Sequence, residues 1–83
     1  MPERWTKLYV SNLGDGVSNN DISVLFSYIG SLSSSTLKYD RMGRPTGIAE
    51  VVFNDHFDVM RALRKYHNLP LDGRPMKIKV ADG

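Results

Sequence analysis

Residues 47–53 read GIAEVVF, and this stretch is the strongest strand signal in the chain. Apolar side chains occupy every second position of it, at Ala49, Val51 and Phe53. A period of two is the spacing of side chains on one face of a β-strand. The intervening positions, which include Glu50, therefore face the other way. The stretch predicts a strand with one buried and one open face.

Three further segments are predicted to be strands. Residues 7–11 and residues 76–80 alternate apolar and polar side chains in the same way. Residues 32–39 are rich in serine, which leaves the start of that strand uncertain, and Leu37 is its expected inward residue. A polar loop, residues 40–45, joins this strand to the next, and its Gly43 is suited to a positive φ.

Two helices are predicted from apolar residues at helical spacing. The first begins at Ser18, with Asp21 three residues on at the spacing of a capping box, and ends at Gly30. The second is capped by Asn54 or Asp55. The inward stripes are Ile22, Leu25, Phe26 and Ile29 in the first helix and Val59, Ala62, Leu63 and Tyr66 in the second.

The element order is therefore β-α-β-β-α-β, which predicts an α+β fold. Two βαβ halves with right-handed crossovers give a ferredoxin-like sandwich, a four-stranded antiparallel sheet with both helices on one face. The other face of the sheet is left open to solvent. We expect function on that open face, because the helices cover the first.

The composition limits what the chain can be. Its 83 residues allow one domain, 1–83, with a core of about residues 6–81. It has no cysteine, which excludes disulfides and cysteine-ligated zinc. No apolar run approaches the roughly 20 residues of a membrane helix, and the polar N-terminus does not resemble a signal peptide, so we expect a soluble protein. A net charge of +2 is weak evidence for an anionic partner.

Two segments resemble the ribonucleoprotein motifs of RNA recognition motifs. Residues 8–13, LYVSNL, resemble the short motif on strand one, and residues 46–53, TGIAEVVF, align with the longer motif on strand three. Residues 71–76, LDGRPM, resemble the usual entry to strand four. The resemblance covers nearly the whole chain and implies an RNA-recognition-motif domain.

The longer motif departs from the family pattern. A typical member has a basic residue first and aromatic residues third and fifth, where this chain has Thr46, Ile48 and Glu50. Of the usual stacking rings only Tyr9 remains. Base–aromatic stacking contributes about 1–3 kcal/mol per base, so we expect weak RNA binding with little sequence preference.

A narrower resemblance is to the ALY/REF mRNA-export adaptors. It rests on residues 10–13, 39–41, 47–53 and 69–76, the last reading LPLDGRPM. It implies a nuclear protein whose partners are single-stranded RNA, an mRNA-export receptor and a DEAD-box helicase. In that family the domain lies between arginine-rich arms, so we expect a monomeric domain excised from a longer protein.

The expected RNA surface combines the open sheet face with the loop between strands two and three. Its cations would contact phosphate in a salt-dependent way. The candidate residues are Lys7, Tyr9, Lys38, Arg41, Arg44, Ile48, Glu50, Lys77 and Lys79.

Each of these candidates also has a plainer interpretation. Strand lysines can serve only to keep a sheet soluble, and Tyr9 can be a surface aromatic that fills the sheet face. Glu50 either pairs with Lys7 or Lys79 across strands or excludes nucleic acid in favour of a protein ligand.

The helical face offers a candidate protein-binding surface of exposed apolar and basic side chains. Partial burial against loops is the alternative, and we expect it for Phe57. The candidates are Val24, Tyr28, Met60, Arg61, Arg64 and Lys65.

We expect no catalysis, no cofactor and no metal. The only histidines, His56 and His67, lie eleven residues apart at the two ends of one predicted helix and are expected to be solvated. No nucleophile-elbow, P-loop or dinucleotide-binding pattern is present. The alternative functions are a protein-interaction domain of another splicing or processing factor and, with little support, a small ferredoxin-like enzyme.

Overall fold

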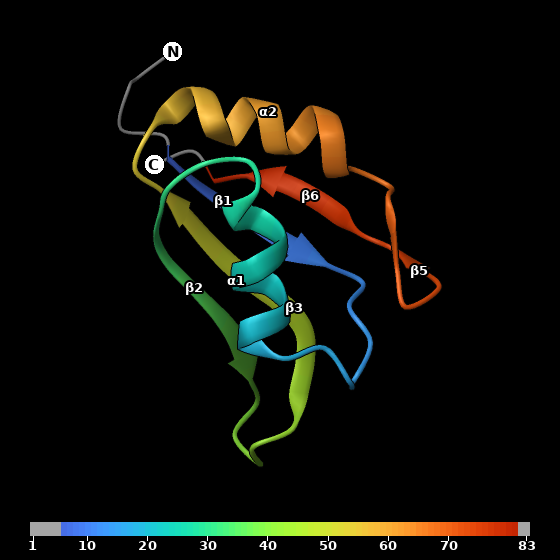
Figure 1. Ribbon diagram of the computed structural model, residues 1–83. Helices are drawn as coiled ribbons and strands as arrows, with labels where there is room; N and C mark the ends of the chain where they lie inside the picture. The colour runs from blue at the N-terminus through green and yellow to red at the C-terminus, as the bar shows by residue number, and fades with distance from the viewer. Residues whose placement is uncertain (1–5, 82–83) are drawn as a thin grey trace.

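Four strands form one antiparallel sheet in the order β2-β3-β1-β6 in the computed structural model, which describes residues 6–81 (Figure 1). Both helices lie on the same side of this sheet (Figure 1). The ferredoxin-like prediction is therefore confirmed, while the ends of the expected domain, residues 1–5 and 82–83, lie outside the described residues. The elements are β1 (Lys7–Ser11), α1 (Asn19–Ser27), β2 (Leu32–Tyr39), β3 (Pro45–Phe53), α2 (His56–Tyr66) and β6 (Lys77–Val80).

A small hairpin was not predicted. The segment between α2 and β6, read from sequence as a turn-rich link, contains β4 (Pro70–Leu71) paired with β5 (Arg74–Pro75). Arg74 ties this hairpin to the end of β1, because its guanidinium donates to the backbone oxygen of Asn12 at 3.1 Å and to the Asn12 side chain at 2.8 Å.

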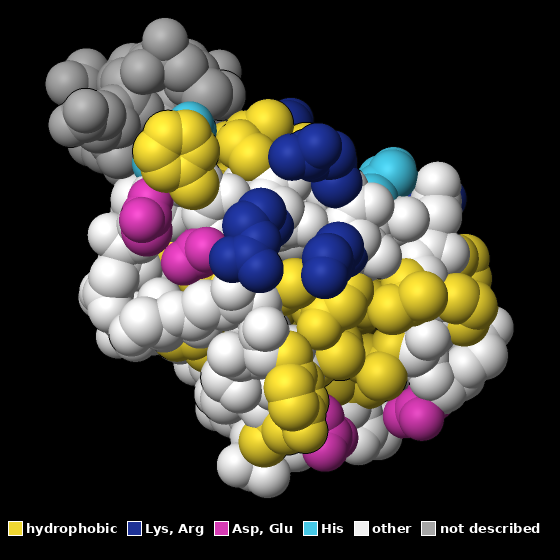
Figure 2. All heavy atoms as spheres, turned by 45° about the horizontal axis from the view of Figure 1, so that its top comes forward, with side chains coloured by type: hydrophobic (Ala, Val, Ile, Leu, Met, Phe, Trp, Pro, Cys, Tyr) yellow, Lys and Arg dark blue, Asp and Glu magenta, His cyan; other side chains and the backbone are white. Residues whose placement is uncertain are grey.

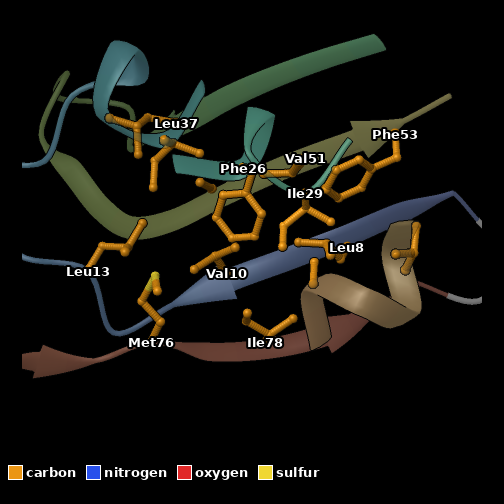
Figure 3. Close-up of a cluster of buried hydrophobic side chains, with 14 of the residues drawn as sticks. Leu8, Val10, Leu13, Phe26, Ile29, Leu37, Val51, Phe53, Met76 and Ile78 are labelled. Carbon is orange, nitrogen blue, oxygen red and sulfur yellow. The ribbon is translucent and has the colours of Figure 1, made fainter. Parts of the chain in front are cut away.

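The core lies between the helices and one face of the sheet. Its strand residues are those at the predicted inward positions, and Leu8, Val10 and Val51 are fully buried. Phe26 of α1 is central to this cluster (Figure 3), and its ring meets that of Phe53 edge-on at a centroid distance of 6.3 Å. Packing of one helix face against one strand face therefore holds the domain together.

The helix starts agree with the sequence, and one helix end does not. The Ser18 hydroxyl accepts from the Asp21 N–H at 3.1 Å and Asp21 accepts from the Ser18 N–H at 3.0 Å, so the capping box is confirmed. Asp55 is the cap of α2. Helix α1 ends at Ser27, before the expected Gly30. Gly30 lies so close to Asp58 that a Cβ there would overlap the carboxylate, so a larger residue at this position would force Asp58 to shift.

Within residues 6–81 no helix is long and apolar enough to cross a membrane.

Replacing Phe26 with alanine is expected to lower the free energy of unfolding by about 3–5 kcal/mol, because it empties the centre of the core. Tyr28→Ala is the matched control, since this neighbouring aromatic side chain is 78% exposed and its loss should change stability by no more than about 0.5 kcal/mol. Urea denaturation followed by circular dichroism measures both. Similar losses at the two positions would contradict the central role of Phe26.

Candidate nucleic-acid interface

The open face of the sheet carries one row of side chains across its centre. Strand register places Tyr9 of β1 opposite Glu50 of β3 on one side and opposite Lys79 of β6 on the other. Thr36 of β2 lies opposite Glu50. The row therefore runs Thr36, Glu50, Tyr9, Lys79, with the single aromatic ring between a carboxylate and an ammonium group.

The structure brings the other predicted sheet residues onto the same face. Lys7 lies beside Val52, and Lys77 lies beside Ser11. Ile48 is 39% exposed, so an aliphatic side chain stands where typical family members present a ring. This geometry places Lys7, Ile48 and Lys77 on the same surface as Tyr9, Glu50 and Lys79.

Glu50 forms ion pairs with both neighbouring strands. Its Oε1 lies 3.7 Å from Lys7 Nζ of β1, and its Oε2 lies 3.4 Å from Lys38 Nζ of β2. The expected partner Lys7 is confirmed, but the alternative partner Lys79 was wrong. The reason is strand order: β1 separates β6 from β3, and Lys38 comes from the strand that lies directly beside β3.

This arrangement changes the charge available to a nucleic acid. Two of the lysines expected to bind phosphate, Lys7 and Lys38, are partly neutralised by Glu50. Lys77 donates to the neutral side chain of Asn68 and keeps its full charge. Lys79 is exposed and has no ion pair among the described residues. The uncompensated positive charge of the sheet therefore lies on β6.

The β2–β3 loop presents one of its two arginines freely. The backbone N–H of Arg44, with that of Met42 and the Arg44 guanidinium, donates to the Asp40 carboxylate and holds the pKa of that carboxyl below its usual range. Gly43 has the expected positive φ of 80°. The Arg44 guanidinium is thus paired with Asp40 within the loop. Arg41 is exposed and has no ion pair among residues 6–81.

The helical side has a groove between α1 and the β4–β5 hairpin. Figure 2 shows an apolar surface here, with lysine and arginine side chains along one margin and carboxylates at the opposite one. The groove has a volume of about 390 Å³ and includes two predicted residues, Val24 and Tyr28. Its lining residues are Asn20, Asp21, Val24, Leu25, Tyr28, Leu71 and Asp72.

Helix α2 provides the basic margin. Arg61 donates to the backbone oxygen of Ile29 at 3.1 Å, which places its side chain toward α1. Lys65 follows Arg61 by four residues and lies on the same flank. Tyr66 donates to the backbone oxygen of Leu25 at 2.8 Å, and burial, followed by the nearby Tyr28, raises the pKa of its hydroxyl.

Two side chains of α2, Met60 and Phe57, do not lie as the sequence predicted. Met60 precedes Arg61 by one residue, a rotation of about 100° around the helix axis, so it lies on another flank and is half-buried. Phe57 was expected to be partly buried and is 73% exposed, because it stands in the first turn, away from the inward Val59 stripe.

Sequence reasoning missed the acidic margin of the groove. Asp21 was recognised only as part of a helix cap, and Asp72 only as part of the segment that resembles the entry to strand four. Nothing local in the sequence places the β4–β5 hairpin beside α1, so no pattern signalled that the two carboxylates would line one groove. Among residues 6–81 no group of three or more potential metal ligands is present.

Comparisons with known proteins agree with these features. The family model for the RNA recognition motif matches residues 8–77. THO complex subunits 4B and 4D of Arabidopsis thaliana are 51% and 49% identical to the chain, each over 94% of it. The chain spans 27% of the length of each of these relatives. The solved RRM3 domain of Hrb1 is 32% identical, with a TM-score of 0.88, over 99% of this chain and 82% of that one.

This family is non-enzymatic, so the prediction of no catalysis is confirmed. The chain belongs to the RNA recognition motif family, and within it the chain resembles the THO complex subunit 4, or ALY/REF, proteins, as its motifs predicted.

Proposed function

We propose that this domain is the RNA-binding and protein-docking part of an ALY/REF-type nuclear mRNA-export adaptor. The observation that carries the proposal is the centre of the open sheet, where one tyrosine stands beside a carboxylate held between two lysines. A surface of this kind holds RNA weakly, through phosphate contacts, and with little sequence preference. The similarity to THO complex subunits 4B and 4D supports the assignment to export.

The RNA would lie over the β6 side of the sheet. Lys77 and Lys79 offer uncompensated charge there, and Tyr9 is the neighbouring ring on which one base can stack. Glu50 repels phosphate on the opposite side of Tyr9, which biases the strand toward β6. Arg41 and Lys38 would contribute long-range attraction from the β2–β3 end.

The groove beside α1 would dock a protein partner. Its apolar floor lies between basic side chains of α2 and the carboxylates of Asp21 and Asp72, so a partner segment with acidic and basic edges fits it. The resemblance to ALY/REF proteins suggests the mRNA-export receptor and a DEAD-box helicase as partners.

A second candidate function is a protein-interaction domain of another splicing or processing factor, with little RNA binding. The observation that favours it is again Glu50, since a carboxylate at the centre of the sheet opposes nucleic acid there. The two functions differ in whether the sheet responds to RNA.

Titration with short single-stranded RNA is expected to shift the amide NMR signals of Lys7, Tyr9, Lys77 and Lys79 together, and added salt should weaken binding. Tyr9→Ala should cost no more than about 1–3 kcal/mol, and Lys79→Ala should reduce the salt slope by about one. Arg64→Ala, on the outer side of α2, is the control. If only helical residues respond, the sheet does not bind RNA.

Glu50→Gln is expected to raise RNA affinity about three- to tenfold at low salt, because it removes a central negative charge and frees Lys7 and Lys38. The matched control is Asp15→Asn, which removes one exposed carboxylate from the β1–α1 loop. Fluorescence anisotropy measures both. Equal gains for the two variants would show that only net charge matters and that the position of Glu50 does not.

Val24→Glu and Tyr28→Ala are expected to weaken binding of a purified mRNA-export receptor about fivefold or more, while RNA affinity stays unchanged, because both side chains border the groove. Phe57→Ala is the matched control, an exposed aromatic outside the groove. Surface plasmon resonance with the receptor immobilised measures the effect. A loss of the same size for Phe57→Ala would argue against the groove as the docking site.

A further inference from the structure

The outer edge of β6 is closed by the segment that follows α2. Strand β6 pairs with β1 on one side only, so its other side is an edge of the sheet. Along this edge the Asn68 N–H donates to the Met76 oxygen at 2.7 Å, and the Met76 N–H donates to the Leu69 oxygen at 2.9 Å. Residues 68–69 thus act as a short substitute for a neighbouring strand.

A histidine side chain continues this closure. The backbone N–H of Ile78 donates to Nδ1 of His67 at 3.0 Å. His67 is the C-cap of α2, and its own N–H donates to the Leu63 oxygen at 3.2 Å, which fixes the residue against the helix end. The sequence predicted a solvated histidine here, and His67 is indeed exposed, but its imidazole also accepts a backbone hydrogen bond that the sequence did not predict.

This bond depends on the ring nitrogen as an acceptor. The Ile78 N–H has no strand partner on this side of β6, because β6 pairs with β1 only. The Nδ1 of His67 supplies the acceptor that a neighbouring strand would otherwise provide.

The residues held by this contact belong to the proposed RNA surface. Ile78 is 5% exposed and anchors β6 in the core, and it lies between Lys77 and Lys79. Asn68, the neighbour of His67, accepts from the ammonium group of Lys77. His67 and Asn68 together therefore fix both the backbone of β6 and one of its two lysines.

We propose that His67 is a positioning residue of the RNA surface, whose imidazole acceptor holds the outer edge of β6 in place. The functional part of this inference rests on the proposed RNA binding, and the structural part does not.

Amide hydrogen exchange followed by NMR at pH 7.5 tests the structural part. In the unmodified domain the Ile78 amide should exchange slowly, because its N–H is bonded to Nδ1 of His67. His67→Ala should speed its exchange, and His67→Asn, which places an Oδ1 acceptor near the position of Nδ1, should restore the protection. His56→Asn is the matched control at the other end of α2 and should leave the Ile78 rate unchanged. An Ile78 amide equally protected in His67→Ala would overturn the proposal.

RNA affinity at pH 7.5 and low salt tests the functional part. With a ten-nucleotide oligouridine probe, His67→Ala should weaken binding about two- to threefold and His67→Asn should restore it. Equal affinities for all three proteins would refute the link to RNA while the Ile78 result stands. If no protein binds oligouridine, the proposed RNA function fails, and the amide exchange still decides whether His67 holds β6.

Discussion

Burial of one face of β3 is the constraint on which the rest of this domain depends. Ala49 and Val51 are fully buried against the helices, and the two-residue period of a strand then forces Glu50 onto the open face. A lone carboxylate at the centre of a sheet is unfavourable, and lysines from β1 and β2 offset it. The ion pairs occupy the part of the sheet where typical family members stack bases, so the fold itself fixes how this surface meets RNA.

Local periodicity predicted which side chains face inward, and it did so correctly for Leu8, Val10 and Leu37. It also predicted the capping box at Ser18, because that motif is complete within four residues. What it could not predict was which strands would be neighbours. Lys38, and not Lys79, pairs with Glu50 because the strand order is β2-β3-β1-β6. This order is a non-local property that no short stretch of sequence contains.

The same limit explains the residues that were underestimated. His67 looked like a solvated helix-end residue, because its acceptor role depends on Ile78, eleven positions further along the chain. Asp72 was identified only within the segment that resembles the entry to strand four, because its place in the groove depends on α1. In each case the residue itself was noted in the sequence, but its role depends on a helix or strand that is distant along the chain. Contacts between such distant segments are what the sequence patterns did not predict.

Strand order also divides the sheet electrostatically. Glu50 partly offsets the positive charge of Lys7 on β1 and Lys38 on β2, whereas no carboxylate among the described residues pairs with the lysines of β6. Phosphate attraction falls with salt, and among the described sheet residues Tyr9 is the ring available for stacking, so the binding that we propose would discriminate poorly between sequences and release readily. An adaptor of the proposed kind would use both properties on many transcripts. In that proposal the aliphatic and acidic side chains of β3 favour general, reversible RNA contact, and the groove on the helical side holds the protein partner.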